Sequence, residues 1–373
     1  MVLTLEQLDN LSTSGADDAW QTVISEALSI CSEPLTGTGS PSEVTKRDRI
    51  VGQLDHFLAA AGWDMWEQFG EVVERNSDHL VRWWEKPFGA KAILVLDGLS
   101  LRELPWLIEG AKERGFTLHE TGAFGAELPS ETNAFAKALG FNSRSQLQNN
   151  GGGMANRLAP VTTECIDLPW KDCANLIDSS PNWIFWHHWP DSKLHDGAGA
   201  GQGLDVLTRD IAAQLTSDDF WEFVEKLATG RRVIITSDHG YAATGMFFDA
   251  ANEQAAFLKN TFKSGRLLAG THDPGPFTPP VALQTNGPHG PYLMALGRWK
   301  WKSQGGYPTL AHGGLSLLEM LCPSIEITKS GITANGHEKR TNCTRGGARR
   351  RGRQTCGHGN GRFQRPQSPE NLP

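Results

Sequence analysis

The sequence predicts an α/β fold in which a mostly parallel sheet is sandwiched by helices and is preceded by a helical N-terminal region. Two short, almost continuous apolar runs, Ala92–Leu96 and Val233–Ile235, are typical of strands buried on both faces of a parallel sheet. Strand patterns and helical patterns alternate from residue 89 to about residue 330. The first 88 residues, by contrast, show helical spacing and few strand signals.

The helical N-terminal region is expected to span residues 1–88. Apolar residues recur with helical spacing at 17–31, 42–61 and 65–85, and a segment rich in glycine, serine and proline interrupts them at 36–41. The region also holds tryptophans that we interpret as packing residues rather than as a binding platform. They are Trp20, Trp63, Trp66, Trp83 and Trp84.

The α/β core is expected to span residues 89–330. A helix is predicted at 218–229, where Gly230 ends it, and a strand follows at 232–236. With 373 residues, of which 39% are apolar and 21% are charged, the chain can bury a full α/β core and carry one accessory region.

Acidic residues stand where both apolar runs end. Asp97 directly follows Ala92–Leu96, and Asp238 comes shortly after Val233–Ile235. Because ligands of open α/β sheets bind outside the carboxyl ends of the strands, these two carboxylates can converge although they lie far apart in the sequence. Each aspartate alone could be a helix N-cap or a turn residue, but the complete set of acidic and imidazole side chains indicates a site.

Further side chains of metal-binding type complete this set. Asp191 and His195 are four residues apart, so in a helical or turn-like segment both can face one ion. His239 and His312 add two further imidazoles. Histidine nitrogen and carboxylate oxygen without any cysteine suit zinc or manganese in a catalytic site.

These segments resemble the alkaline phosphatase superfamily and, within it, the PglZ domain family linked to bacteriophage resistance. The resemblance covers about residues 90–328 and keeps the order of the superfamily's motifs. The motifs that carry it are Val95-Leu96-Asp97-Gly98, Leu128-Pro129-Ser130-Glu131-Thr132, Asp191-x-x-x-His195, Thr236-Ser237-Asp238-His239-Gly240, and His312 to Met320 followed by Pro323.

The resemblance implies a site for two divalent metal ions, with zinc expected and manganese as the alternative. One ion would be held by Asp97, Thr132, Asp238 and His239, and the second by Asp191, His195 and His312. Three carboxylates and a Thr132 alkoxide would balance the charge of the two ions, which leaves a locally neutral site that a phosphate can enter. In such sites the two ions lie about 4 Å apart.

Thr132 is the expected nucleophile, because metal coordination lowers the cost of forming its alkoxide. It opens the helix pattern Thr132–Leu139, which Gly140 ends, so a role as a helix N-cap stays open as an alternative. Ser130 is the second candidate nucleophile. No asparagine of the segment 149–153 is assigned to oxyanion stabilisation, and no arginine clamp is expected near Thr132, which favours phosphodiesters as substrates.

The resulting hypothesis is a metal-dependent phosphoryl-transfer enzyme that hydrolyses phosphodiesters, with nucleotides or oligonucleotides among its candidate substrates. The resemblance implies a role in bacteriophage defence, with defence-system proteins as partners. Two alternatives stay open: a phosphomonoesterase or phosphomutase of the same superfamily, and a non-catalytic scaffold subunit of a defence complex. A sulfatase is less favoured, because Pro129–Thr132 lacks the Cys/Ser-x-Pro-x-Arg setting of those enzymes.

Composition restricts the location and the partners. A net charge of -7 argues against a globally basic nucleic-acid binder. The six cysteines show no metal or redox spacing and are expected to be reduced thiols. No basic stretch precedes an apolar one at the N-terminus, and no apolar run approaches the length of a membrane span. We therefore expect a cytoplasmic protein that does not enter a membrane.

After about residue 331 the composition changes abruptly. Arginine and lysine stand among glycine, glutamine, asparagine and proline with hardly any apolar residue, so residues 331–373 cannot form a core and are predicted to be a disordered basic tail. Two roles stay open for this tail: an arm that contacts nucleic acid, and an extension with no selected role.

Overall fold

The structure is a computed structural model. It describes residues 3–36, 41–152, 155–196, 203–262, 265–270, 277–288, 290–302 and 309–329, and for residues 195 and 196 it describes the backbone alone. The predicted basic tail at 331–373 lies outside the described residues. Most of the predicted helical region and of the predicted α/β core lies within them.

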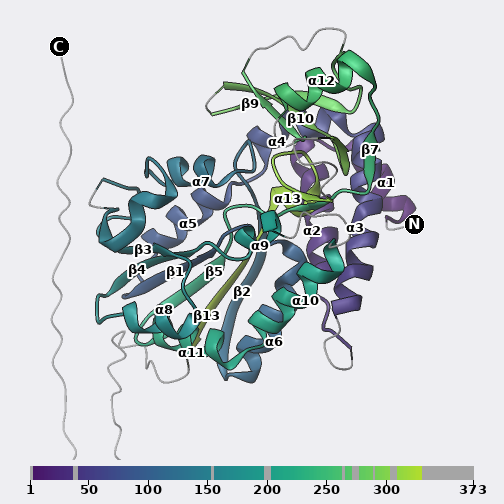
Figure 1. Cartoon of the computed structure of the whole chain (residues 1–373). Coiled ribbons are helices and arrows are strands. Elements are labelled where there is room, and N and C mark those ends of the chain that lie inside the picture. Colours follow the sequence, from purple (N-terminus) through teal and green to yellow (C-terminus); the bar gives the residue numbers. More distant parts are fainter. Residues whose placement is uncertain are drawn as a thin grey trace, which may run out of the picture. The chain divides into compact units, whose positions relative to one another are not determined.

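Among the described residues, six strands form one sheet in the order β2-β13-β5-β1-β4-β3 (Figure 1). Their bounds are Lys91–Leu96 for β1, Phe116–Gly125 for β2, Thr162–Ile166 for β3, Asn182–His187 for β4, Arg232–Thr236 for β5 and Leu321–Lys329 for β13. Strands β5, β1, β4 and β3 run parallel, whereas β13 is antiparallel to both of its neighbours. The prediction of a mostly parallel sheet is confirmed, and the two apolar runs lie in its neighbouring strands β1 and β5.

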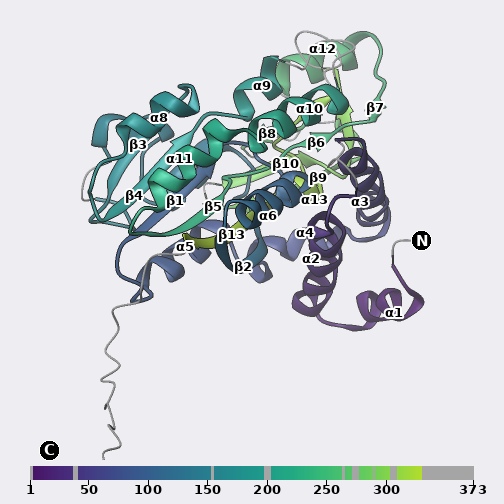
Figure 2. The ribbon, with the colours of Figure 1, turned by 90° about the horizontal axis from the view of Figure 1, so that it is seen from below.

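Helices cover both faces of this sheet (Figures 1 and 2). Successive side chains of β1 belong to different hydrophobic clusters on the two faces of the sheet. Leu94 is in the cluster that includes helices α6, α8, α10 and α11. Ile93 and Val95 are in the cluster that includes helices α5 and α7. The bounds are Asn76–Glu85 for α5, Leu104–Glu113 for α6, Thr132–Ala138 for α7, Trp170–Leu176 for α8, Leu204–Leu215 for α10 and Asp218–Ala228 for α11. Short 3-10 helices follow β1 and α7 at Leu101–Glu103 (η1) and Arg144–Asn150 (η2). The sandwich of helices around the sheet is therefore confirmed.

The predicted helical N-terminal region is confirmed as well. It contains α1 (Leu5–Thr13), α2 (Ala16–Ser32), α3 (Pro41–Ala61), α4 (Trp63–Val72) and α5. The predicted segment 65–85 is divided between α4 and α5, because the residues between them bind the end of β2, where Gly125 N donates to Glu74 O at 2.9 Å. Trp20, Trp66 and Trp83 are at most 1% exposed, which supports a packing role for them, whereas Trp63 is 39% exposed.

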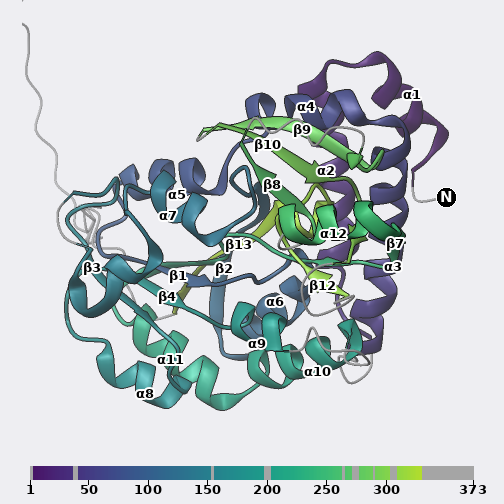
Figure 3. The ribbon, with the colours of Figure 1, turned by 45° about the horizontal axis from the view of Figure 1, so that its top comes forward.

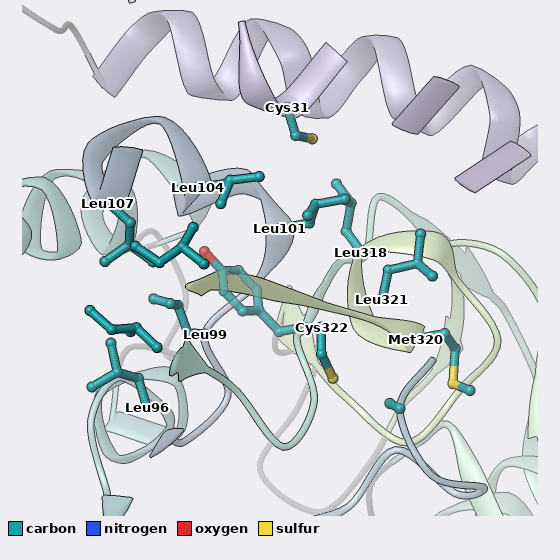
Figure 4. Packing of buried hydrophobic residues seen from close by; sticks show 14 of the residues in the cluster. Cys31, Leu96, Leu99, Leu101, Leu104, Leu107, Leu318, Met320, Leu321 and Cys322 are labelled. Carbon is teal, nitrogen blue, oxygen red and sulfur yellow. The ribbon is translucent and has the colours of Figure 1, made fainter. Parts of the chain in front are cut away.

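The N-terminal helices share a hydrophobic core with the sheet. In Figure 4, Cys31 of α2 lies above Leu101 and Leu104, which belong to the segment after β1, and Leu318 and Leu321 lie beside them. All five are at most 1% exposed. The described residues between 3 and 329 accordingly form one compact unit.

The chain between β5 and β13 adds an accessory layer. Its elements are β6 (Ala242–Ala243), β7 (Met246–Phe248), α12 (Asn252–Thr261), β8 (Leu267–Ala269), β9 (Ala282–Gly287), β10 (Gly290–Ala295), β11 (Trp299–Trp301), β12 (Leu310–Ala311) and α13 (Leu317–Met320). Strands β8, β10 and β9 form a small antiparallel sheet near α4 (Figure 3). Within the described residues, none of the helices combines the length and the apolarity needed to cross a bilayer.

Candidate metal site

Three predicted carboxylates lie at the carboxyl end of the parallel strands. Asp97 directly follows β1, Asp238 lies two residues beyond β5, and Asp191 opens α9 (Asp191–Asp196) after β4. The backbone joins two of these segments, because Asp97 N donates to His187 O at 3.0 Å and Asp191 N donates to Asp97 O at 2.9 Å. The structure thus brings together carboxylates from three strand exits, as expected for a parallel sheet.

Gly98 explains why α9 can approach β1 so closely. Its φ is +71°, which favours glycine, and a Cβ placed on it would lie 3.0 Å from Asp191 Cβ. The Asp97-Gly98 pair therefore has a geometric basis: the aspartate faces the site, and the glycine leaves room for the next carboxylate.

The first group of possible ligands consists of Asp97, Asp238 and His239, whose ligand atoms lie within 4.8 Å of one another. All three residues are at most 1% exposed. Asp238 Oδ1 accepts a hydrogen bond from Gly98 N at 2.9 Å, whereas Asp238 Oδ2 has no hydrogen-bond partner among the described residues. A buried carboxylate oxygen without a donor is unfavourable unless a cation compensates it, so this group fits a divalent metal ion.

The second group consists of Asp191, His239 and His312, again with ligand atoms within 4.8 Å of one another. His312 Nε2 lies 3.8 Å from Asp191 Oδ1, and the rings of His239 and His312 are stacked with their centroids 4.4 Å apart. His239 belongs to both groups, whereas the resemblance assigned it to the first alone. His195 lies on α9 as predicted, but its side chain is outside the described residues.

Both imidazoles are oriented by backbone carbonyls. His239 Nδ1 lies 2.9 Å from Gly240 O, and His312 Nδ1 lies 3.1 Å from Ser130 O. Since a carbonyl only accepts, each Nδ1 carries the proton, and in the neutral ring Nε2 has its lone pair available. Both Nε2 atoms face carboxylates of the site, which is the orientation that a metal ligand requires.

Thr132 reaches the first group. Its Oγ1 is 3.3 Å from Asp97 Oδ1 and 3.4 Å from His239 Nε2, and the residue is partly exposed. Thr132 is the first residue of α7, and the N-cap is Glu131. The alternative role as a helix N-cap is therefore wrong, because the hydroxyl faces the site and caps no backbone N–H.

Ser130, the second candidate nucleophile, has a structural role. It is fully buried, its Oγ accepts a hydrogen bond from Gly313 N at 3.1 Å, and its carbonyl oxygen orients His312. Ser130 thus ties the loop before Thr132 to the loop that carries His312.

The electrostatics reflect the crowding of carboxylates. Burial raises the pKa of Asp97 well above its usual range, and the neighbouring Asp238 and Asp191 raise it further. Burial alone would lower the pKa of His239, but the three carboxylates outweigh it and raise this pKa to about 9. The pKa values of Asp97 and His239 are both raised by neighbouring carboxylates, so negative charge is in excess at the site. This excess favours the binding of a cation.

Arg144 is a residue that the sequence interpretation missed. Its Nη1 forms an ion pair with Asp97 Oδ2, and the other oxygen of this carboxylate accepts from Thr132 Oγ1. That no arginine clamps a phosphate near Thr132 stays a prediction, because the partner of Arg144 in the structure is Asp97. Arg144 lies on η2 outside every recognised motif, so only the fold brings it to the site. The Trp186 indole also donates to Asp97 Oδ2, at 3.1 Å.

Two further polar residues, His187 and Asn150, have partners outside the ligand groups. His187 Nε2 lies 2.9 Å from Leu168 O, and Nδ1 of the same ring accepts from Trp189 N at 3.1 Å. In the segment for which no oxyanion role was assigned, Asn150 Oδ1 accepts from Thr163 N at 3.1 Å. These residues organise the loops around the site rather than the site itself.

Comparisons with known proteins give a distant likeness. No protein-family model matches the chain, and no curated protein sequence matches it either. Among solved structures, murine ectonucleotide pyrophosphatase/phosphodiesterase 5 is similar at a TM-score of 0.43 and 10% identity, over 64% of this chain and 88% of that one. An inactive threonine-to-alanine variant of the same mouse protein in complex with AMP is similar at a TM-score of 0.42 and 10% identity, over 64% of this chain and 87% of that one. These likenesses are too distant to bear on function, which the residues of the site address directly.

Proposed function

We propose that the protein is a metal-dependent phosphoester hydrolase of the alkaline phosphatase type, with Thr132 as its nucleophile. The observation that carries the proposal is the position of the Thr132 hydroxyl beside two adjoining groups of metal-ligand atoms that share His239. The sequence motifs support the superfamily and the PglZ-like assignment within it.

The ligand set supports a site for two metal ions, with zinc favoured by the mixture of imidazole and carboxylate. Asp97, Asp238, His239 and Thr132 would hold one ion, and Asp191, His312 and His195 would hold the other. When bound, such ions lower the cost of removing the threonine proton and stabilise negative charge on the phosphate oxygens and on the leaving oxygen.

The chain's own residues position the reacting atoms. Thr132 Oγ1 donates a hydrogen bond to Asp97 Oδ1, which keeps one lone pair of the hydroxyl oxygen directed into the site. Attack by this oxygen forms a bond to phosphorus, the bond from phosphorus to the leaving oxygen breaks, and the proton of the hydroxyl passes to the leaving oxygen or to solvent. Water then cleaves the phosphothreonine, which releases phosphate or a phosphomonoester and restores the hydroxyl.

The choice between diester and monoester substrates depends on Arg144. Phosphodiester hydrolysis is the function proposed from the sequence, with a nucleotide or oligonucleotide as the substrate class. Arg144 favours a second candidate, phosphomonoester hydrolysis, because a guanidinium at Asp97 can bind an additional phosphate oxygen of a dianion. A non-catalytic scaffold subunit of a defence complex is the third possibility to be tested.

An assay with purified, zinc-loaded protein tests the proposal. The substrates are bis(p-nitrophenyl) phosphate and p-nitrophenyl phosphate, and the variants are Thr132→Ala and Thr132→Ser. We expect Thr132→Ala to keep its metal and to lose turnover by several orders of magnitude, and Thr132→Ser to retain measurable turnover because it keeps a hydroxyl. A Thr132→Ala variant as active as the parent would refute the nucleophile. Monoester preference would select the second candidate, and a metal-loaded parent inactive on both esters would favour the scaffold.

A role in bacteriophage defence and a cytoplasmic location belong to the same proposal. The resemblance of the motifs to PglZ domains supports the defence role. Four cysteines of the described residues, Cys31, Cys165, Cys173 and Cys322, are free and buried, which supports a reducing compartment.

A further inference from the structure

The two carboxylate oxygens of Asp97 have different surroundings. Oδ1 is 3.3 Å from Thr132 Oγ1 and 3.9 Å from His239 Nε2, so it faces the first ligand group. Oδ2 accepts from Trp186 Nε1 at 3.1 Å and from Arg144 Nη1. Oδ1 therefore accepts from the Thr132 hydroxyl and faces the other ligand atoms, whereas Oδ2 accepts from two N–H donors.

We infer that Trp186, together with Arg144, is a positioning residue that restricts Asp97 to binding a metal ion through Oδ1 alone. This inference rests on the metal site of the proposed function. A carboxylate can bind a metal ion through one oxygen or through both, and its hydrogen bonds decide between these modes. With both lone-pair directions of Oδ2 taken by N–H donors, Asp97 cannot chelate the ion without losing those bonds.

The indole is held rigidly enough for this purpose. Trp186 lies on β4, is fully buried, and packs edge-on against Phe135 with ring centroids 5.5 Å apart and an interplanar angle of 79°. Phe135 belongs to α7, the helix that Thr132 opens. The same ring therefore fixes the orientation of Asp97 and supports the helix that carries the nucleophile.

The two donors approach Asp97 from different environments. The Trp186 side chain comes from the core, whereas the Arg144 side chain is 28% exposed on η2. Removing Arg144 would also remove a positive charge beside the bound ion, and this would alter metal affinity by itself. Trp186 is neutral, so a substitution there isolates the effect of the hydrogen bond.

Cobalt titration of the whole chain tests the inference, since the visible absorption of protein-bound Co²⁺ weakens as its coordination number rises. The test variant is Trp186→Phe, which removes the N–H and keeps an aromatic ring. The matched control is Trp83→Phe. Trp83 is fully buried in the same core, and its indole nitrogen has no hydrogen-bond partner among the described residues.

We expect Trp186→Phe to weaken the binding of one of two Co²⁺ ions by roughly 10- to 100-fold and to lower its visible absorption, as Asp97 becomes free to chelate. Trp83→Phe should bind both ions as the parent does. Identical titrations and spectra for the two variants would overturn the inference. A parent that binds no Co²⁺ would overturn both the inference and the proposed function.

A second measurement needs no variant and applies if Trp186→Phe fails to fold. In the intact protein, the Trp186 indole N–H proton should keep the downfield chemical shift of a hydrogen-bonded indole in NMR spectra recorded both without metal and with Zn²⁺. An upfield shift when Zn²⁺ is added would mean that the ion draws Oδ2 away from the indole, and it would contradict the inference.

Discussion

Two buried clusters of charged side chains in this molecule differ in how their carboxylates are compensated. In the first, α3 supplies Asp48 and Asp55. Asp48 accepts from Arg102 Nε at 2.8 Å and from Arg298 Nη1 at 2.7 Å, and Asp55 accepts from Arg298 Nε at 2.9 Å and from Leu317 N at 2.7 Å. Two carboxylates thus meet two guanidinium groups, and every carboxylate oxygen has a donor. We call this group the α3 ion network.

The candidate metal site has the opposite balance. Its three aspartates, Asp97, Asp191 and Asp238, lie near one guanidinium, that of Arg144, and one buried imidazole, that of His239, and Asp238 Oδ2 has no hydrogen-bond partner among the described residues. The pKa values of the buried aspartates reflect this difference in compensating charge. Burial would raise the pKa of Asp48, but the α3 ion network lowers it, whereas the pKa of Asp97 is raised. Burial of aspartates alone therefore does not indicate a metal site, but burial without matching positive charge does.

The substitution with the largest expected effect on stability is one that breaks the α3 ion network. Asp48→Asn should lower the free energy of unfolding by about 3–5 kcal/mol, because it leaves two buried guanidinium groups without their full counter-charge. The matched substitution Asp238→Asn should cost much less in the metal-free protein, because the relief of its repulsion with Asp97 offsets the lost attraction to His239. Urea unfolding in the presence of a chelator measures both. If Asp238→Asn destabilised the chain as much as Asp48→Asn, the two clusters would not differ as described.

The pH dependence of stability should distinguish two buried histidines. The pKa of His239 is raised to about 9, so its protonation stabilises the metal-free fold fully below pH 6.5, and this contribution is lost as the pH rises through 9. Burial lowers the pKa of His79, which stacks on Phe124, to about 4, so its contribution is present above pH 6.5 and is lost as the pH falls toward 4. Each change amounts to about 3 kcal/mol at most.

Chelator-treated variants test these pH windows separately. His239→Asn should flatten the decline between pH 6.5 and 9, and His79→Asn should flatten the decline between pH 6.5 and 4. Unfolding titrations at intervals of pH give the slopes. An unaltered slope above pH 6.5 in His239→Asn would show that the carboxylates of the site do not stabilise the imidazolium.

The smallest effect on stability is expected for an exposed ion pair, and it tests whether burial causes the larger effect of Asp48→Asn. Arg82 and Glu74 are 2.7 Å apart, but their side chains are 60% and 34% exposed. Arg82→Gln should change the free energy of unfolding by less than about 1 kcal/mol, because water and salt screen the pair. A loss as large as that of Asp48→Asn would contradict the attribution of the larger effect to burial.

Much of the fold follows from local sequence patterns. The apolar runs that end at Asp97 and near Asp238 predict the strands β1 and β5, and the helix predicted at 218–229 is α11. The antiparallel strand β13 was not specified, because its direction depends on the path of the chain through the accessory layer. The division of the segment 65–85 also depends on a distant partner, Gly125 at the end of β2.

The residues of the candidate site that a motif places shortly after a strand, such as Asp97 after β1 and Asp238 after β5, could be predicted from the sequence. Thr132 and His312 lie with Asp97 in the structure because loops tied by Ser130 bring them there, and the motifs preserve the order of these loops. Arg144 could not be found in this way, since it is a single residue on a 3-10 helix with no pattern around it. The sharing of His239 by two ligand groups depends on distances across the sheet, which the sequence does not contain.

Metal binding to the whole chain tests the central claim most directly. Metal-free protein is titrated with Zn²⁺ by calorimetry, in parallel with Asp238→Asn and His239→Ala, and the bound metal is counted after dialysis. We predict two Zn²⁺ ions per chain for the parent, weaker binding for both variants, and a rise in the free energy of unfolding of about 2.7 kcal/mol for each site at a free Zn²⁺ concentration 100-fold above its Kd. A parent that binds no Zn²⁺ or Mn²⁺, or variants that bind as tightly as the parent, would contradict the account.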